Sequence, residues 1–194
     1  MSRDVFHDRS GRIAKAAIAL GFAPRKFKYL EANVTPFGAV IAAPPPETRE
    51  LFCRSGLKYY ARIPARNIRL ALAELAKQRN RMRRARPADE AGRLLQSELD
   101  LAARMAEQSC HHMLWQQALA ARRKAEARAL ARHGIRALQA IECDSKSYWP
   151  LRNKGTTARC SPFLRWRIND LRRGILHFQP EVARLARARK YAAE

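Results

Sequence analysis

The chain has 194 residues and a formal net charge of +22, with 39 Lys and Arg against 17 Asp and Glu. This length can bury a helical core in one domain or two small ones, so neither disulfides nor a structural metal is required. The positive excess is spread over both halves of the chain, and it destabilises a free compact monomer through self-repulsion. Composition therefore favours a subunit that works against a polyanion and argues against a free enzyme with paired catalytic carboxylates.

The cysteines and the hydropathy argue against two further classes, disulfide-rich secreted proteins and membrane-spanning proteins. The four cysteines are Cys53, Cys110, Cys143 and Cys160. They form no Cys-x-x-Cys pair, which predicts reduced thiols in an intracellular compartment. No run approaches the roughly eighteen apolar residues of a membrane span, so we expect a soluble or peripheral protein. Residues 1–20 are basic and amphipathic like a mitochondrial transit peptide, but Asp4 and Asp8 argue against one.

Residues 1–46 are predicted to form an extended basic arm that contains one short helix and a proline-rich linker. The helix is expected over residues 10–21, with Ser10 as its cap and Gly21 at its end. Residues 37–41 could form one brief strand. Three successive prolines, Pro44 to Pro46, cannot join a sheet interior and predict a polyproline linker.

A basic and aromatic segment lies inside this arm, at residues 24–30, and is predicted to be extended or turning. Its cations are Arg25, Lys26 and Lys28, and its aromatic residues are Phe27 and Tyr29. Aromatic rings between cations suit stacking on unpaired bases while the cations hold phosphates. The alternative is a loop that pins both rings into the core.

Residues 47–140 are predicted to form a helical bundle. A first helix begins near Glu47 and is interrupted at Pro64, and a second begins at Ala65 with its apolar residues on one face. Pro87 ends the second helix and opens a third, with Asp89 in the first turn, where the helix dipole favours anions. We expect the third helix to bend or break near residues 109–112. One long helix over residues 88–133 is the alternative.

The second helix of this bundle has the densest positive charge of the chain. Between Lys77 and Arg86 there are six cations and no acid. These side chains project in every direction around a helix, so one apolar partner cannot neutralise their field, whereas a nucleic-acid strand offers repeated phosphates. A second cationic stretch follows at residues 122–132, a pattern that long solvated helices also show.

Residues 141–194 are predicted to form a basic loop followed by C-terminal helices. Residues 142–161 read as irregular, with Tyr148 and Trp149 ahead of three cations, and form the second candidate for contact with single-stranded RNA. Ser161 and Pro162 start one helix, and Pro180 starts another. The whole chain is therefore predicted to be an all-α protein, an irregular bundle of about five to six helices with extended basic loops.

The residues expected to bind RNA share a positive charge and a place in one of these segments. They are Arg25, Lys26, Lys28, Arg66, Arg69, Lys77, Arg79, Arg81, Arg83, Arg84, Arg86, Arg122, Arg123, Arg152, Lys154, Arg159, Arg165, Arg172 and Arg173. The residues expected to stack on bases are Phe27, Tyr29, Tyr148 and Trp149.

The sequence contains no glycine-rich phosphate loop, Gly-x-Ser-x-Gly elbow or His-Glu-x-x-His helix. Cys110, His111 and His112 are the one cluster that suggests a metal. Successive residues of a helix diverge by about 100° each, so these three cannot all face one ion. We therefore expect no catalytic residue, no metal and no cofactor.

Residues 49–105 contain a set of short motifs in a familiar order. The segment Arg49-Glu50-Leu51-Phe52-Cys53-Arg54 is similar to a Leu-Tyr-Arg triplet, with Phe in place of Tyr and Cys53 inserted. A later proline, an Asn-Arg pair and a proline followed by a Leu-Leu pair are found at Pro64, at Asn80-Arg81, and at Pro87 with Leu94-Leu95. In this order the segment resembles the mitochondrial LYR family.

The resemblance implies a small basic three-helix protein. Members of that family serve as accessory subunits of respiratory complexes, as iron–sulfur assembly factors and occasionally as ribosome-associated proteins, commonly with an acyl carrier protein as partner. By this resemblance, Leu51, Phe52 and Arg54 would contact the partner.

Two functions are carried forward from the sequence. We favour a non-enzymatic structural subunit of an organellar ribosome in the mitochondrial matrix, which clamps ribosomal RNA and contacts neighbouring ribosomal proteins through its helix faces. The alternative is a LYR-like accessory subunit or assembly factor of a mitochondrial respiratory complex, with the subunits of that complex and acyl carrier protein as partners. A DNA-binding regulator is less favoured because no helix-turn-helix spacing stands out.

Overall fold

The all-helical fold predicted from the sequence is confirmed. In the computed structural model the described residues are 4–28, 35–42, 63–152 and 161–176, and within them lie six α-helices, one short 3-10 helix and no strand. The α-helices are α1 (Arg12–Phe22), α2 (Pro36–Ala42), α4 (Ala65–Arg83), α5 (Glu90–Ala120), α6 (Lys124–Arg152) and α7 (Pro162–Arg173), and the 3-10 helix is η1 (Ala23–Phe27). In this part of the chain, no helix combines the length and the apolar character that crossing a membrane requires.

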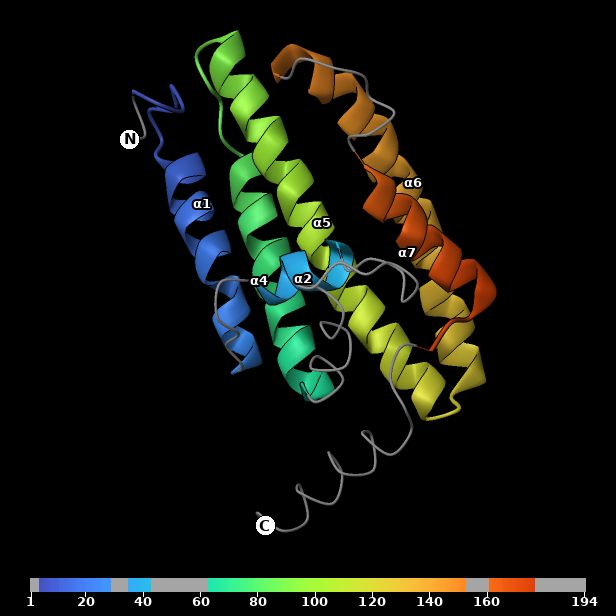
Figure 1. Ribbon diagram of the computed structural model, residues 1–194. Helices are drawn as coiled ribbons and strands as arrows, with labels where there is room; N and C mark the ends of the chain where they lie inside the picture. The colour runs from blue at the N-terminus through green and yellow to red at the C-terminus, as the bar shows by residue number, and fades with distance from the viewer. Residues whose placement is uncertain (1–3, 29–34, 43–62, 153–160, 177–194) are drawn as a thin grey trace.

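Helix α5 is the centre of the bundle. It packs against α4, α2 and α6, while α1 packs on α4, and α7 packs on α6 and α2. Figure 1 shows α1, α4 and α5 running side by side, with α6 and α7 as a second pair beside them and the short α2 crossing near the middle. Helix α5 therefore separates two groups of helices and contacts both.

Two apolar clusters hold these groups to α5. The first joins η1, α2, α4 and α5 around Phe27, Ile68 and Cys110. The second joins α5 to α6 and α7 around Trp115 and Leu164. From Ile68 on, the buried residues of α4 recur every three or four positions, which is the spacing of one helix face. The buried residues of this helix are Asn67, Ile68, Ala71, Leu75, Gln78 and Met82.

The segment before α1 is anchored to the start of α5. Asp89 is the N-cap of α5: one carboxylate oxygen accepts the N–H of Gly92 at 2.9 Å, and the other pairs with the ring of His7. The N–H of Ala88 donates to the carbonyl of His7 at 2.9 Å. Glycine is needed at position 92 because a Cβ there would lie 2.5 Å from the carbonyl oxygen of Phe6.

The start of α1 differs from the prediction. The helix begins at Arg12 and runs through Gly21 to Phe22. Ser10 accepts the N–H of Arg12 at 3.3 Å, but the buried carboxylate of Asp8 accepts the N–H of Ile13 at 3.0 Å and that of Ser10 at 2.9 Å. Gly11 therefore holds the N-cap position, and Asp8 and Ser10 share the first-turn N–H groups of Ile13 and Arg12, although the sequence pattern had assigned the cap to Ser10 alone.

Four segments predicted to be extended, irregular or broken are helical. Residues 23–27 form η1, and residues 37–41 lie in α2 instead of a strand. Helix α5 runs unbroken through residues 109–112, and the chain turns at Ala121–Arg123, where Arg122 has a φ of 55°. Helix α6 continues to Arg152, so the predicted domain boundary at residues 140 and 141 and the first half of the predicted basic loop fall inside a helix.

Several predicted features lie outside the described residues. They are the polyproline linker at Pro44–Pro46, the helix from Glu47, the LYR-like residues Leu51, Phe52 and Arg54, the end of the basic loop at residues 153–160, and the helix from Pro180.

Two leucines of α4 provide a test of this packing. Leu75 is 1% exposed in the first apolar cluster, whereas Leu70 on the same helix is 49% exposed. We expect Leu75→Ala to lower the free energy of unfolding by about 3 kcal/mol, because it leaves a cavity in the core. The matched Leu70→Ala change should stay within about 0.5 kcal/mol of the unaltered chain. Chemical denaturation of both variants measures the difference, and equal losses would contradict the assigned face of α4.

Candidate nucleic-acid interface

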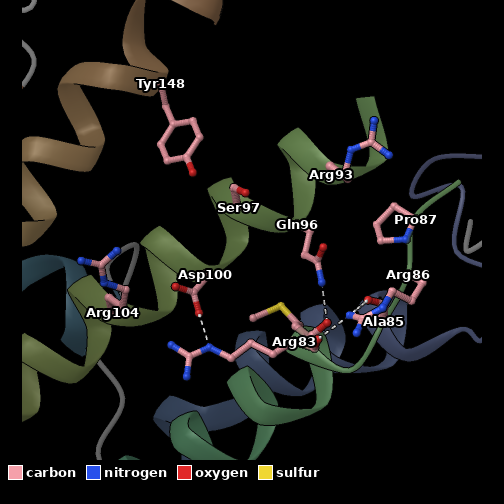
Figure 2. Close-up of a pocket in the computed structure, with 11 residues that line it drawn as sticks. Arg83, Ala85, Arg86, Pro87, Arg93, Gln96, Ser97, Asp100, Arg104 and Tyr148 are labelled. Carbon is pink, nitrogen blue, oxygen red and sulfur yellow. Dashed lines mark hydrogen bonds and ion pairs between the residues drawn. The ribbon is translucent and has the colours of Figure 1, made fainter. Parts of the chain in front are cut away.

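A groove of about 480 Å³ lies where the end of α4, the start of α5 and the end of α6 come together. Its charged lining consists of four arginines, Arg83, Arg86, Arg93 and Arg104, and one aspartate, Asp100. Tyr148 of α6 forms part of the same lining. Figure 2 shows these side chains around the groove. We call this site the basic groove.

Helix α5 supplies one wall through a regular spacing. Arg93, Ser97, Asp100 and Arg104 follow one another at intervals of three or four residues, so they share one helix face. Gln96 lies beside them, and its Nε2 donates to the carbonyl of Met82 at the end of α4 at 2.5 Å. This hydrogen bond holds the first half of α5 against α4.

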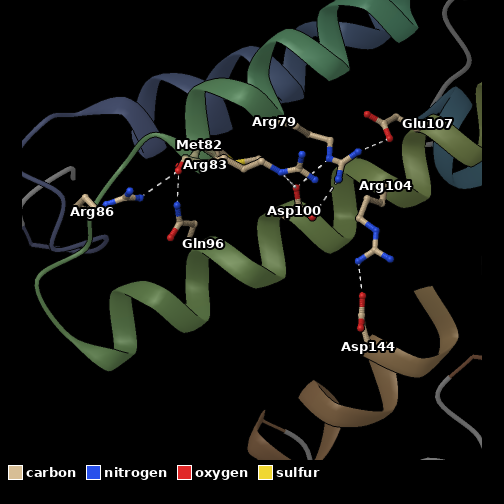
Figure 3. Close-up of polar contacts among 9 residues, drawn as sticks. All are labelled: Arg79, Met82, Arg83, Arg86, Gln96, Asp100, Arg104, Glu107 and Asp144. Carbon is tan, nitrogen blue, oxygen red and sulfur yellow. Dashed lines mark hydrogen bonds and ion pairs between the residues drawn. The ribbon is translucent and has the colours of Figure 1, made fainter. Parts of the chain in front are cut away.

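The opposite wall comes from α6. Arg104 of α5 forms an ion pair with Asp144 of α6, which connects the two helices beside the basic groove (Figure 3). Tyr148 lies four residues after Asp144 and so shares its helix face. Figure 2 shows the Tyr148 ring projecting from α6 toward Ser97. The ion pair therefore positions the helix face that presents the aromatic ring.

Arg79 has a structural role behind the basic groove. Its Nε lies 2.9 Å from Asp100 Oδ1 and its Nη1 lies 2.6 Å from Glu107 Oε2 (Figure 3). All three side chains are largely buried, with 15–24% of their surface exposed. Burial raises the pKa of Glu107, and the positive charge of Arg79 opposes this rise only in part. The pairs join α4 to α5 and hold the Asp100 carboxylate at the edge of the groove.

The structure corrects the roles predicted for Arg79 and Phe27. Arg79 was expected to face phosphates, but its guanidinium is occupied by Asp100 and Glu107 in the α4–α5 interface. Phe27 was expected to stack on a base, but it is 1% exposed and packs edge-to-face on Phe37, with ring centroids 5.2 Å apart. The alternative left open by the sequence, an aromatic ring pinned into the core, is the arrangement of Phe27.

Many of the other predicted cations are exposed, but they lie on several separate elements. Those exposed on η1, α4, the α4–α5 connection, the α5–α6 turn and α7 are Arg25, Lys26, Lys28, Arg66, Arg69, Lys77, Arg83, Arg84, Arg86, Arg122, Arg123, Arg165, Arg172 and Arg173. Arg81 and Trp149 are half-buried. Tyr29, Lys154, Arg159 and the side chain of Arg152 lie outside the described part of the chain. Of all the described residues predicted to bind or stack on RNA, only Arg83, Arg86 and Tyr148 line the basic groove.

Sequence reasoning missed Arg93, Arg104 and Asp100 as residues of the site. A signal for Arg93 and Arg104 was present, because both lie on the polar face of a predicted helix at helical spacing. Their proximity to Tyr148 depends on how α5 and α6 pack, and spacing along the chain does not contain that information.

Cys110, His111 and His112 point into three different environments. Cys110 is fully buried in the first apolar cluster, and burial raises the pKa of its thiol. His111 packs on the ring of His133, with centroids 4.7 Å apart, and burial together with His133 lowers the pKa of His111 to about 4. His112 packs on Trp115. Within the described ranges, no three His, Cys, Asp or Glu side chains lie close enough together to hold a metal ion.

Comparison with known proteins does not assign the chain to a family. No family model matches the chain, and no match was found among curated proteins or solved structures. The resemblance to the LYR family therefore depends only on the short motifs quoted above, and function has to be inferred from the residues of the basic groove.

The Arg79 pairs can be tested by substitution and pH. We expect Arg79→Met to lower the free energy of unfolding by about 2 kcal/mol at pH 7, because it leaves the largely buried Glu107 without its ion-pair partner and Asp100 with only the longer contact to Arg83. The loss should shrink as the pH falls. Glu107 has a raised pKa in the folded state, so its protonation favours folding as the pH falls through that value.

The control for this experiment is Lys77→Met, which removes an exposed cation from the same helix. Thermal or chemical unfolding of both variants should be measured at pH 7 and at pH 5. A loss for Arg79→Met that is no larger than that of Lys77→Met would contradict a structural role for Arg79.

Proposed function

We propose that this chain is a non-enzymatic, RNA-binding structural subunit of an organellar ribosome, in the mitochondrial matrix, held between ribosomal RNA and neighbouring ribosomal proteins. The observation on which the proposal depends is the basic groove, where four arginines and one aspartate surround a space of about 480 Å³ with a tyrosine in its lining. Phosphates are the ligands that such a set of guanidinium groups suits, because the Arg fork bonds two oxygens at once.

The placement of the acids supports a polyanionic partner. Asp100 and Glu107 pair with Arg79, Asp144 pairs with Arg104, and Glu142 pairs with Arg165 at 2.7 Å. These acids are already used within the chain. Asp100 also lies 3.8 Å from Arg83, but 61% of the Arg83 side chain stays exposed, and Arg86 and Arg93 are exposed at the basic groove as well. A phosphate backbone supplies the closely spaced negative charges that would balance these arginines.

The lining of the basic groove suits binding better than acid–base chemistry. Asp100 is its one carboxylate, and that carboxylate accepts two hydrogen bonds from Arg79, at 2.9 and 3.3 Å. Both oxygens of this carboxylate are therefore engaged by a guanidinium and are not free to take a proton from a ligand in the groove. This supports a subunit without catalytic activity. The mitochondrial setting is proposed from the sequence resemblance alone.

Native size fractionation tests the assembly. The chain should migrate with a large ribonucleoprotein particle in an organellar extract and move to smaller sizes after ribonuclease treatment, because RNA holds it there. Migration that is insensitive to ribonuclease, together with co-purification of acyl carrier protein or respiratory subunits, would contradict the ribosomal proposal and favour the LYR-like alternative.

Salt dependence of RNA binding tests the basic groove. Each phosphate contact contributes about 0.7 to the slope of log K against log salt for a single strand. Replacing Arg83, Arg86 and Arg93 with Gln should therefore lower the magnitude of the slope by about 2 if all three contact phosphates. Fluorescence anisotropy with a short labelled RNA at several salt concentrations gives the slope.

A matched variant removes the same charge elsewhere. Arg9, Lys15 and Arg136 are exposed and lie outside the groove lining, so replacing them with Gln tests for a general charge effect. We expect this variant to change the slope much less than the groove variant does. Equal changes would show that overall charge, and no particular surface, governs RNA binding.

A further inference from the structure

We propose that the basic groove binds an unpaired nucleotide of an RNA strand, with the base stacked on Tyr148 and a flanking phosphate held by Arg86 and Arg93. This inference rests on the proposed RNA-binding function and makes it more specific, because it names single-stranded RNA as the ligand and assigns the two ends of the groove to different parts of a nucleotide.

The charges of the basic groove are distributed unevenly along its length. At one end, Arg104 is paired with Asp144, and Asp100 is paired with Arg79 and, at 3.8 Å, with Arg83, so carboxylates offset much of the positive charge. At the other end, Arg86 and Arg93 are exposed, and Asp89, which interacts electrostatically with Arg93, lies outside the lining. Figure 2 shows Tyr148 near Arg104 and Ser97, with Arg86 and Arg93 at the far end. A phosphate would therefore bind at the Arg93 end and an uncharged base at the Tyr148 end.

The dimensions of the groove agree with this orientation. Its volume of about 480 Å³ is in the range of pockets that hold small ligands, roughly 300–1,000 Å³. Arg93 and Arg104 are separated by eleven positions on α5, which is about 16 Å at the rise of an α-helix. That length accommodates a nucleotide with a neighbouring phosphate. A double helix keeps its bases stacked inside, so it could reach the rim arginines but could not place a base against Tyr148.

Tyr148 has the surroundings of a fixed stacking platform. Its ring is half-buried and projects from the face of α6 that the Arg104–Asp144 ion pair holds against α5. A tyrosine ring offers its face to any base, so stacking there is tolerant of sequence. Ser97 lies opposite and offers a hydroxyl that can donate to or accept from a base edge or a ribose 2′-hydroxyl.

Two substitutions in the full chain test this assignment. Binding of a short single-stranded RNA and of the duplex formed with its complement should be compared for the unaltered chain, Tyr148→Leu and Tyr148→Phe. We expect Tyr148→Leu to weaken single-strand binding about tenfold, since it removes one stacked base, and to change duplex binding by less than about twofold. Tyr148→Phe should bind single strands as the unaltered chain does, because it keeps the ring.

A second measurement uses the unaltered chain and so does not depend on the folding of any variant. The same single-stranded RNA containing 4-thiouridine should crosslink at Tyr148 on irradiation, and mass spectrometry of the digested product locates the crosslink. Crosslinks confined to peptides outside the basic groove would overturn the inference.

The outcomes separate this inference from the proposed function. If the Arg83, Arg86 and Arg93 variant loses RNA affinity while Tyr148→Leu binds single strands unchanged, the nucleotide site is wrong and RNA binding by the groove stands. If the unaltered chain does not bind RNA, or if the arginine variant binds it unchanged, the proposed function of the groove fails together with the nucleotide site.

Discussion

Helix α5 must bury apolar side chains on two sides at once, and the arrangement of the other helices follows from this requirement. Cys110 and Met113 belong to the cluster with α2 and α4, while Trp115 and Ala118 belong to the cluster with α6 and α7. Burial is greatest in the second half of α5, whereas residues 93–102 are exposed or only half-buried. The first half of the helix is therefore free to present a polar face, and the basic groove lies there.

Electrostatics determines which arginines remain available at that face. Packing α4 and α6 on α5 brings arginines into the interfaces, where an unpaired charge would cost several kcal/mol. Asp100, Glu107 and Asp144 offset this cost by pairing with Arg79 and Arg104. Because these acids are used between helices, they leave the rim arginines to define the potential of the groove. The same pairs that stabilise the bundle thus give the groove one nearly neutral end and one cationic end.

Periodicity predicted the class of fold and several helix ends, but not the helix breaks. The start of α4 at Ala65 and the anion at the start of α5 follow from local rules of proline and capping. The break expected at residues 109–112 is absent because Ser109 donates to the carbonyl of Phe37 at 2.7 Å and Cys110 is buried in the core. Both contacts are tertiary. Likewise, α6 continues past residue 142 because one face of α6 packs on α5. No local sequence pattern shows that contact.

The distribution of cations explains why the density of Lys and Arg along the sequence identified only some residues of the basic groove. Charge density alone identified Arg83 and Arg86, yet it also selected Arg79, which lies in an interface. A helix with cations all around it has to turn one of them toward its neighbour, and only packing decides which. The exposed cations lie on η1, α4, the α5–α6 turn and α7, so the proposed RNA partner would meet phosphate-binding side chains on several elements. A protein that lies on one face of a duplex would need its charge on one surface, so this distribution agrees better with a subunit embedded in folded RNA.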